Sequence, residues 1–416
     1  MVAMGFLAAT WAMISELKRK EKQGLLHPTH DEVVTGEGPT TMDLFWSGLV
    51  GFLLGFKIVG IVTAYMAGDI GPISQNPMGY FISTEGNIIG GIIGAALFTF
   101  MRYREKKKQQ LPQPKRTKVA VYPHQRIGEI LIIAALGGLA GAKLFNALET
   151  WEDFVRDPIG SLTSSSGLTF YGGLIVATAI FWYFARKYKI RFVHLCDAAA
   201  PAIMIAYGIG RFGCQFAGDG DWGIYNSAYV TNHATGKLEP ASVAQYANTV
   251  KYYEPYFKDT RQVKTDGSLH NLSVKAPSWL PQALFAQCYP SNVNNTGIPL
   301  PNCTGDHCSV LPIGVFPTPL YEAFICIALF FVLWAIRKKI KVPFHFFAIY
   351  LIMNGVERFF VEKIRVNYKY DWGFIHPTQA EIISTAFVLI GISVLLFYKG
   401  GKDIAPAENT MAAPVV

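Results

Sequence analysis

Charged residues are scarce in this chain of 416 residues: they make up 16% of it, whereas hydrophobic residues make up 51%. Soluble domains carry about a quarter charged residues, so this shortage excludes an ordinary soluble protein and indicates one that lies in a membrane. The sequence also lacks a Ser-His-Asp pattern, a phosphate-binding loop, a zinc motif and a dinucleotide fingerprint, which argues against the chemistries that depend on those motifs.

The sequence contains several long apolar stretches. Most of them approach the ~20 residues that a helix needs to cross a hydrocarbon core. We therefore predict an all-α polytopic membrane protein with about nine transmembrane helices. The first helix (residues 1–20) is predicted to be short or to begin upstream of Met1, since it lacks the pattern of a cleavable signal. The stretches are 1–15, 42–66, 86–101, 127–148, 166–185, 193–212, 320–336, 343–361 and 380–398.

Lysine and arginine concentrate in alternate loops between these stretches. Loop 67–85 has none and loop 149–165 has only Arg156, whereas loop 102–126 is strongly basic. The positive-inside rule then places the amino terminus outside and the carboxyl terminus, with its tail 401–416, in the cytoplasm. We therefore expect the basic residues behind the net charge of +8 to face anionic lipid headgroups, and no nucleic acid is expected as a partner.

Residues 217–318 are polar and rich in Asn and Pro, and on this topology they form one large extracytoplasmic head inserted between helices. The segment holds Cys288, Cys303 and Cys308. In an oxidising compartment any two of these cysteines can pair, and a metal site made of all three is the less favoured alternative. The remaining cysteines lie in apolar spans and are interpreted as small core residues.

Two parts of the sequence repeat each other. "GFLLGFKI" (51–58) shares a G-x-x-x-G-x-K frame with "GGLAGAKL" (137–144), and "IGGII" (89–93) matches "YGGLI" (171–175). The repeat predicts that the helix pair in 42–105 duplicates a pair in 127–216. The alternative is the small-residue packing common to membrane helices. Tyr171 of the second copy aligns with Ile89 of the first, so we assign any chemistry to the second copy.

An arginine stands near the predicted outer end of span 193–212. Arg211 follows a long apolar run, and an ionisable residue at that depth is costly unless it faces a cavity, a partner or an anion. The glycine-broken stretch after it lets the backbone approach a ligand closely. The residues that follow it in this stretch are Gln215, Asp219, Asp221, Trp222 and Gly223.

A second arginine, Arg358, lies in an outward-running span, with Glu362 and Arg365 on the same helical face at i+4 and i+7. A structural ion pair of Arg358 with Glu357 or Glu362 is one interpretation. Two arginines at the same outer level in different spans favour a shared anionic ligand instead. Phosphate fits best, because a guanidinium binds it through two parallel hydrogen bonds.

Four stretches together resemble the bacterial prolipoprotein diacylglyceryl transferases: "GLTFYGGLI" (167–175), "YGIGRFGCQFAGDGDWG" (207–223), "FPTPLYE" (316–322) and "ERFFVEKIR" (357–365). The resemblance covers about residues 127–398. It implies a seven-helix family core, formed by the first helix with 127–216 and 319–400, to which the duplicated pair and a large head are added. It also implies a bacterial cytoplasmic (inner) membrane enzyme without metal or organic cofactor.

The implied reaction moves a diacylglyceryl group from phosphatidylglycerol to the lipobox cysteine thiol of a prolipoprotein and releases glycerol phosphate. Carried over by motif, the expected catalytic residues are Arg211, Arg358, Tyr171, Asp219 and Glu322. The expected substrate-binding residues are Gln215, Asp221, Gly223, Tyr321, Glu362 and Arg365.

The sequence departs from the family pattern in three places. Tyr171 stands where a catalytic histidine is common, and Phe316 replaces the histidine usual before the "PxQLYE" motif. The family's tyrosine near the start of the first helix has no counterpart here. The signature stretch is also one residue longer than the common form, and we prefer Asp219 to Asp221 as its acid. An unperturbed tyrosine is a poor base, so Tyr171 is expected to donate a hydrogen bond, while Asp219, Glu322 or the phosphate takes the thiol proton.

Two other functions remain open at this point. A secondary transporter for an anionic solute also buries arginines and contains repeats, but its site lies near the midplane between inverted halves. A lipid-binding scaffold needs the arginines for phosphate but not the acids and tyrosines around them.

Overall fold

The fold comes from a computed structural model, which describes residues 1–68, 80, 83–163, 169–258, 260, 262–264, 268–301, 303–367, 369–371 and 373–400. The predicted cytoplasmic tail 401–416 lies outside the described residues, as do 164–168 of the "SSSGLTFYGG" stretch. The chain divides into two compact units. Unit 1 comprises Met1–His27 and Tyr122–Val416, and unit 2 comprises Pro28–Val121.

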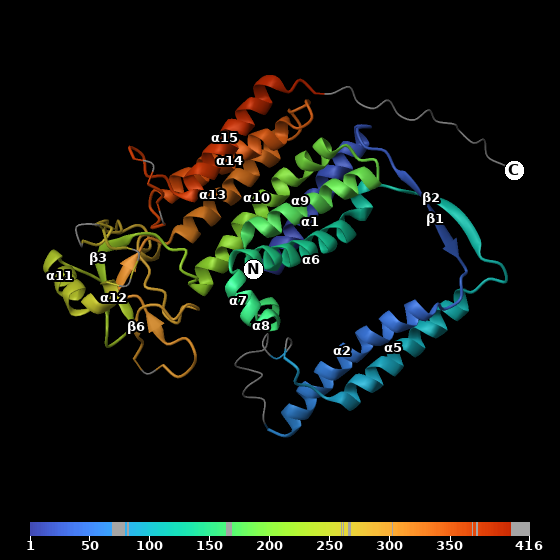
Figure 1. The fold of residues 1–416 in the computed structure, drawn as a ribbon, viewed down its shortest axis with the longest axis horizontal. Helices are drawn as coiled ribbons and strands as arrows, with labels where there is room; N and C mark the ends of the chain where they lie inside the picture. Colours follow the sequence, from blue (N-terminus) through green and yellow to red (C-terminus); the bar gives the residue numbers. More distant parts are fainter. Residues whose placement is uncertain are drawn as a thin grey trace. The chain divides into compact units, whose positions relative to one another are not determined.

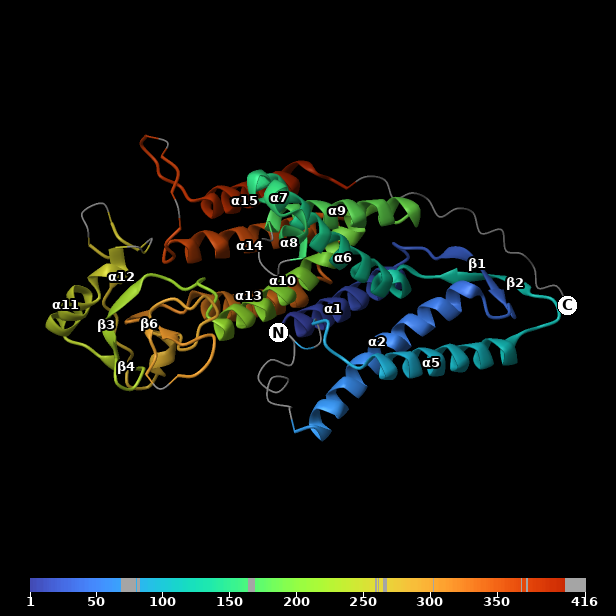
Figure 2. The ribbon, with the colours of Figure 1, turned by 60° about the horizontal axis from the view of Figure 1, so that its bottom comes forward.

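Unit 1 is built mainly from helices that run side by side in Figures 1 and 2. The helix α10 lies among them and packs against α1, α13 and α14, while α6 pairs with α9 and α14 pairs with α15. The principal helices are α1 (Val2–Lys22), α6 (Pro123–Glu149), α9 (Phe170–Lys187), α10 (Phe192–Ala217), α13 (Thr318–Ile336), α14 (His345–Glu362) and α15 (Gln379–Phe397); the short helices α7 (Trp151–Arg156) and α8 (Pro158–Thr163) follow α6.

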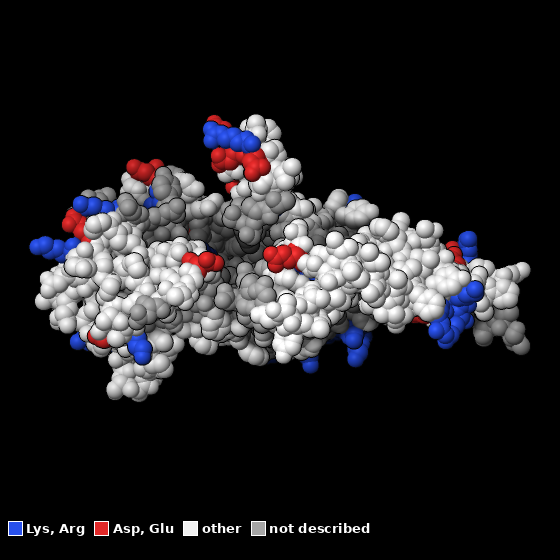
Figure 3. Space-filling model, turned by 90° about the horizontal axis from the view of Figure 1, so that it is seen from below, with Lys and Arg blue, Asp and Glu red and all other residues white. Residues whose placement is uncertain are grey.

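Each of the nine apolar stretches lies largely within a helix. Among the described residues, five helices are long and apolar enough to cross a membrane: α2, α6, α10, α13 and α15. On the face in Figure 3 most of the surface is uncharged and the charged side chains lie in separate groups. The protein is therefore a polytopic membrane protein. The helix α14 is not among the five, because Glu357, Arg358 and Glu362 interrupt its apolar sequence.

The first helix is longer than the apolar run 1–15. Beyond that run α1 buries two charged residues, Glu16 and Lys20. Lys20 donates to Asp197 of α10 at 3.0 Å, and Asp197 in turn accepts the backbone N–H groups of Phe344 and Phe347 at 3.0 Å each. These bonds satisfy donors at the start of α14 that its own helix cannot satisfy.

The residues between α10 and α13 fold into a small part with strands and short helices, which we call the head segment (Figure 2). The central strand β3 pairs with β4, β5 and β8. The hydrophobic core of the head segment includes the buried residues Tyr225, Phe257 and Ile313. Cys303 and Cys308 form a disulfide, and Cys288 is a buried free thiol. The elements are β3 (Tyr225–Asn232), β4 (Lys237–Pro240), α11 (Val243–Tyr252), α12 (Glu254–Lys258), β5 (Asn271–Leu272), η1 (Gln282–Leu284), β6 (Ile298–Pro299), β7 (Ser309–Val310) and β8 (Ile313–Val315).

Unit 2 consists of β1 (Thr29–Thr35), α2 (Thr41–Met66), α5 (Ile88–Gln109) and β2 (Lys115–Val121). The strands pair antiparallel, with Thr29 opposite Val121, so the two ends of the unit lie side by side. Glycines allow α2 and α5 to approach closely, because a Cβ on Gly55 would clash with the Gly90 carbonyl.

The helix pair α2/α5 of unit 2 repeats contacts found in the pair α6/α9 of unit 1. A Cβ on Gly141 would likewise clash with the Gly172 carbonyl. The backbone N–H of Asn87 donates to Phe56 at 2.9 Å, and at the aligned positions Thr169 donates to Ala142 at 3.2 Å. The aligned lysines agree too: Lys57 donates to the Ser83 carbonyl at 2.7 Å, and Lys143 donates to the Ser161 carbonyl at 3.3 Å.

Candidate functional site

Charged side chains from separate helices converge where the start of α13 meets the ends of α10 and α14. Arg211 lies in the last two turns of α10, Glu322 lies near the start of α13, and Arg358 and Glu362 lie in the last turns of α14. Arg365 lies shortly after α14, beyond Lys363 and Ile364. We call Arg211, Asp221, Glu322, Arg358, Glu362 and Arg365 the ion-pair cluster.

Glu322 joins the arginines of the cluster. Its Oε2 pairs with Nε of Arg211, and its Oε1 pairs with Nη1 of Arg358 at 2.5 Å and with Nη1 of Arg365 at 3.5 Å. The Glu322 side chain is 0% exposed. A buried carboxylate is stable only where charged donors surround it, and here one carboxylate holds three guanidiniums together.

Asp221 joins two of the same arginines from the loop after α10. Its Oδ2 pairs with Nη1 of Arg211 and its Oδ1 pairs with Nη2 of Arg365. Burial raises the pKa of Asp221, but Arg365 and Arg211 together hold this pKa below its ordinary value. The backbone carbonyl of Asp221 accepts the Thr318 hydroxyl at 2.6 Å.

Our preference for Asp219 as the acid of the signature stretch is not supported by this geometry, because Asp221 makes the ion pairs. Gly218 and Gly220 adopt φ of +61° and +92° on either side of Asp219. These left-handed conformations favour glycine and turn the chain so that the second acid, not the first, meets the arginines.

The third carboxylate is Glu362, whose Oε2 lies 3.3 Å from Nη2 of Arg358. Its other oxygen accepts the Asn367 amide at 2.7 Å. Of the two partners considered for Arg358 on its own helix, Glu362 forms the ion pair. The carboxylate oxygens of Glu357 are buried and make no hydrogen bond within the described part of the chain.

Two tyrosines border the arginines. The Tyr207 ring lies 5.2 Å from the Arg211 guanidinium, one helical turn earlier on α10. This contact is a cation–π interaction, which the i, i+4 spacing could have indicated. Tyr171, in the first turn of α9, interacts electrostatically with Arg358 and Tyr370.

The head segment holds the end of α10 through several polar contacts. Gln215 donates to Gln287 at 2.7 Å and accepts the Tyr289 hydroxyl at 2.9 Å. The Tyr321 hydroxyl donates to the Leu284 carbonyl at 2.5 Å. Gln215 and Tyr321 were both expected to bind substrate, and the structure places their polar groups on the head segment. No motif or spacing in the sequence had indicated Tyr289 or Gln287.

A glycine is required at position 223 because the backbone of neighbouring segments approaches it closely. Its N–H donates to the Phe316 carbonyl at 2.8 Å, and a Cβ there would clash with the Ile364 carbonyl. Gly223 also forms a backbone bridge with Arg365. The glycine therefore joins the signature loop to the segment that carries the third arginine.

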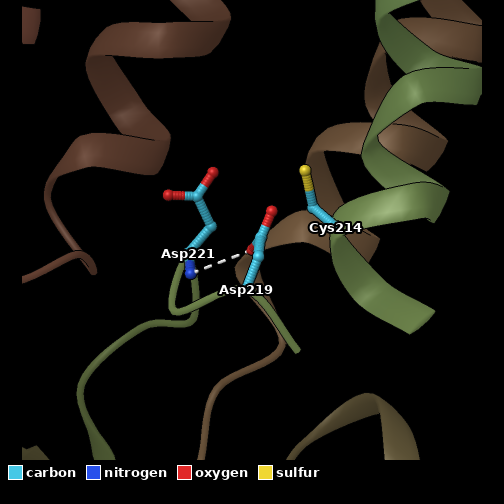
Figure 4. Close-up of side chains that lie close together, drawn as sticks. All are labelled: Cys214, Asp219 and Asp221. Atoms are coloured by element: carbon cyan, nitrogen blue, oxygen red, sulfur yellow. Dashed lines mark hydrogen bonds between the residues drawn. The ribbon is translucent and has the colours of Figure 1, made fainter. Parts of the chain in front are cut away.

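Cys214, Asp219 and Asp221 place one potential ligand atom each within 4.8 Å of the others (Figure 4). Both Asp221 oxygens already pair with guanidiniums, and Nη1 of Arg211 lies 3.7 Å from the Cys214 sulfur. A cation here would meet positive charge directly, so the set is a poor metal site.

Comparison with known proteins locates the similarity in the same part of the chain. The family model described as prolipoprotein diacylglyceryl transferase matches residues 113–397. A phosphatidylglycerol–prolipoprotein diacylglyceryl transferase of Stenotrophomonas maltophilia is 26% identical over 278 residues, which is 65% of this chain and 74% of that protein. A protein of the same name from Leptospira interrogans is 25% identical and covers 68% of this chain and 80% of its own length.

Proposed function

Because the chain belongs to the prolipoprotein diacylglyceryl transferase family, we propose that it transfers the diacylglyceryl group of phosphatidylglycerol to the lipobox cysteine thiol of a prolipoprotein. The thiol sulfur attacks the glyceryl carbon, and glycerol phosphate leaves. The observation that supports this most directly is the sharing of one buried carboxylate, Glu322, by Arg211 and Arg358.

The arginines bind the phosphate of the lipid. As the carbon–oxygen bond breaks, the leaving phosphate gains negative charge, and guanidiniums already in position stabilise that charge in the transition state. Glu322 and Glu362 hold Arg211 and Arg358 in place and so act as positioning residues. Fixed donors in a partly dry site stabilise developing charge more than mobile ones in water.

Tyr171 donates a hydrogen bond to the phosphate or orients the thiol. Its electrostatic interaction with Arg358 supports a place at the edge of the ion-pair cluster. An unperturbed thiol with pKa near 8.5 is ionised to only a few per cent at neutral pH, so a proton acceptor assists the reaction. Tyr171 is a poor candidate for that acceptor.

The ion-pair cluster lies at the outer leaflet of the bacterial cytoplasmic membrane, with the amino terminus outside and the carboxyl terminus in the cytoplasm. The basic last turns of α1, α5 and α9 support this orientation through the positive-inside rule. The Cys303–Cys308 disulfide supports an oxidising compartment for the head segment.

The transporter and scaffold functions differ from the enzyme in what they do to a peptide. Incubation of the purified protein with labelled phosphatidylglycerol and a lipobox peptide tests all three, since only the enzyme attaches label to the peptide thiol. Arg211→Ala is expected to reduce the rate by about 100-fold or more, because one fixed donor to a developing anion contributes that much.

Arg156→Ala is the matched control, since the Arg156 side chain is 77% exposed on α7 and pairs only loosely with Asp153 at 3.9 Å. Its rate should equal that of the wild type. Near-normal transfer by the Arg211 variant would refute the assignment of Arg211, and an unlabelled peptide with the wild-type protein would refute the transferase function.

A further inference from the structure

The three carboxylates of the ion-pair cluster differ in their access to solvent. The Glu322 and Glu362 side chains are 0% exposed, whereas the Asp221 side chain is 33% exposed. The two glutamates belong to helices, and Asp221 belongs to the loop between α10 and β3. Asp221 is therefore the carboxylate that can leave its partners without carrying an unpaired charge through the protein interior.

Asp221 presents two anionic oxygens to two guanidiniums. One oxygen pairs with Arg211 and the other with Arg365. A phosphodiester also presents two anionic oxygens on one central atom, and arginine binds carboxylate and phosphate in similar geometries. The Asp221 carboxylate thus fills the position in which a lipid phosphate would bridge the same two arginines.

Charge balance also requires one carboxylate to move. Within the described residues the ion-pair cluster holds three guanidiniums and three carboxylates, so its formal charges cancel. An incoming phosphate anion gains little from a cluster that is already neutral. If Asp221 turns toward solvent, the remaining groups carry one net positive charge, which matches the phosphodiester.

The backbone of the loop does not have to change for this movement. The Asp221 carbonyl is held by the Thr318 hydroxyl at 2.6 Å, and Gly223 is held by the Phe316 carbonyl at 2.8 Å. Rotation about the side-chain bonds of Asp221 is sufficient to release its carboxylate, and side chains change rotamer far faster than an enzyme turns over.

We propose that the lipid phosphate displaces Asp221 from Arg211 and Arg365, and that the displaced carboxylate accepts the proton of the attacking thiol. This inference rests on the proposed function. In the resting cluster Arg211 and Arg365 oppose protonation of Asp221. Once the phosphate engages those arginines, the carboxylate faces an anion in place of two cations and binds a proton more readily.

The reaction then balances as follows. The S–H bond of the substrate cysteine breaks and its proton goes to Asp221, while a bond forms between sulfur and the glyceryl carbon. The bond from that carbon to the phosphate oxygen breaks, its electron pair stays on the oxygen, and glycerol phosphate leaves with one more negative charge. Asp221 returns the proton to water and pairs with Arg211 and Arg365 again.

Other ionisable groups face Asp221 and would share its pH dependence. Arg211 and Cys214 approach it from α10, Asp219 from its own loop and Arg365 from the segment after α14. Glu322 of α13 reaches it through the shared arginines. The matched control is Asp153 of α7, which lies outside this group of residues and whose side chain is 74% exposed.

Steady-state transfer from phosphatidylglycerol vesicles to a lipobox peptide, measured from pH 6.5 to 9.5, tests the proposal. Asp221→Asn is expected to lower the KM for phosphatidylglycerol severalfold, because no carboxylate competes with the phosphate. Its kcat should fall by about 100-fold at pH 7, the usual contribution of a general base. The kcat deficit should shrink above pH ~8.5, where the thiol ionises by itself.

Asp153→Asn should change neither the KM for phosphatidylglycerol nor the pH profile. Asp221→Glu keeps the carboxylate and should keep the wild-type pH profile, which covers the case that Asp221→Asn does not fold. A raised KM for Asp221→Asn, or a kcat deficit that stays constant with pH in both Asp221 variants, would overturn the proposal. Wild-type protein that modifies no peptide at any pH would instead overturn the transferase function.

Discussion

At the scale of single residues, the arginines are recognisable from the sequence but their partners are not. A charged side chain at the end of an apolar run is conspicuous, and the i+4 spacing of Arg358 and Glu362 places them on one face. Arg211 and Glu322 form an ion pair, but they lie more than a hundred residues apart in the sequence. No spacing rule connects two residues at that separation. The choice between Asp219 and Asp221 likewise depended on loop geometry that one added residue changes.

Glu322→Gln gives a prediction at this scale. The substitution keeps the shape of the side chain but removes the charge that pairs with Arg211, Arg358 and Arg365. Removing one partner of a buried ion pair lowers the free energy of unfolding by about 3–5 kcal/mol. The melting temperature of the purified protein in detergent should therefore fall clearly.

Glu254→Gln serves as the control, since Glu254 is 58% exposed on α12 and pairs with Lys258 across one helical turn. Its melting temperature should match that of the wild type. An unchanged melting temperature for Glu322→Gln would mean that Glu322 does not hold the arginines together.

At the scale of elements, we interpret unit 2 as a duplicated helix pair. The aligned glycines, the aligned lysines and the aligned backbone hydrogen bond recur between α2/α5 and α6/α9. Generic small-residue packing explains glycines at a helix crossing, but it does not explain a repeated N–H to carbonyl bond from Asn87 and Thr169. Tyr171 belongs to the α6/α9 copy, and Ile89 stands at the aligned position of α2/α5.

Excision of unit 2 follows as a prediction. The strands β1 and β2 pair Thr29 with Val121, so His27 and Tyr122 can be joined by a short linker without moving either end far. The ion-pair cluster and the family match both lie outside residues 28–121. The shortened chain should keep transfer activity within several-fold of the wild type, measured with labelled phosphatidylglycerol and a lipobox peptide.

Removal of the other pair, residues 123–187, should abolish transfer because it deletes Tyr171 and the neighbours of α10. A shortened chain without unit 2 that elutes as a folded protein but transfers nothing would contradict our view that the chemistry belongs to unit 1 alone.

At the scale of the whole molecule, the proposed orientation predicts which side of the membrane each segment faces. Lys258→Cys, in the exposed part of α12, should react with a membrane-impermeant maleimide in intact spheroplasts. Lys339→Cys, in the exposed turn after α13, should react only after the membrane is permeabilised. The unsubstituted chain gives the background from the native cysteines, and the reverse labelling pattern would refute the orientation.

The sequence by itself determined the helical class, the approximate helix positions and the alternation of basic loops, because apolar length and charge asymmetry act locally along the chain. It also predicted that Arg211 and Arg358 lie together, and both pair with Glu322 in the structure. Only the tertiary structure decided that Lys20 is buried against Asp197, that Asp221 replaces Asp219 at the arginines and that the head segment holds Gln215 and Tyr321. Periodicity reports which face of a helix is apolar, but it does not report which distant side chain that face meets.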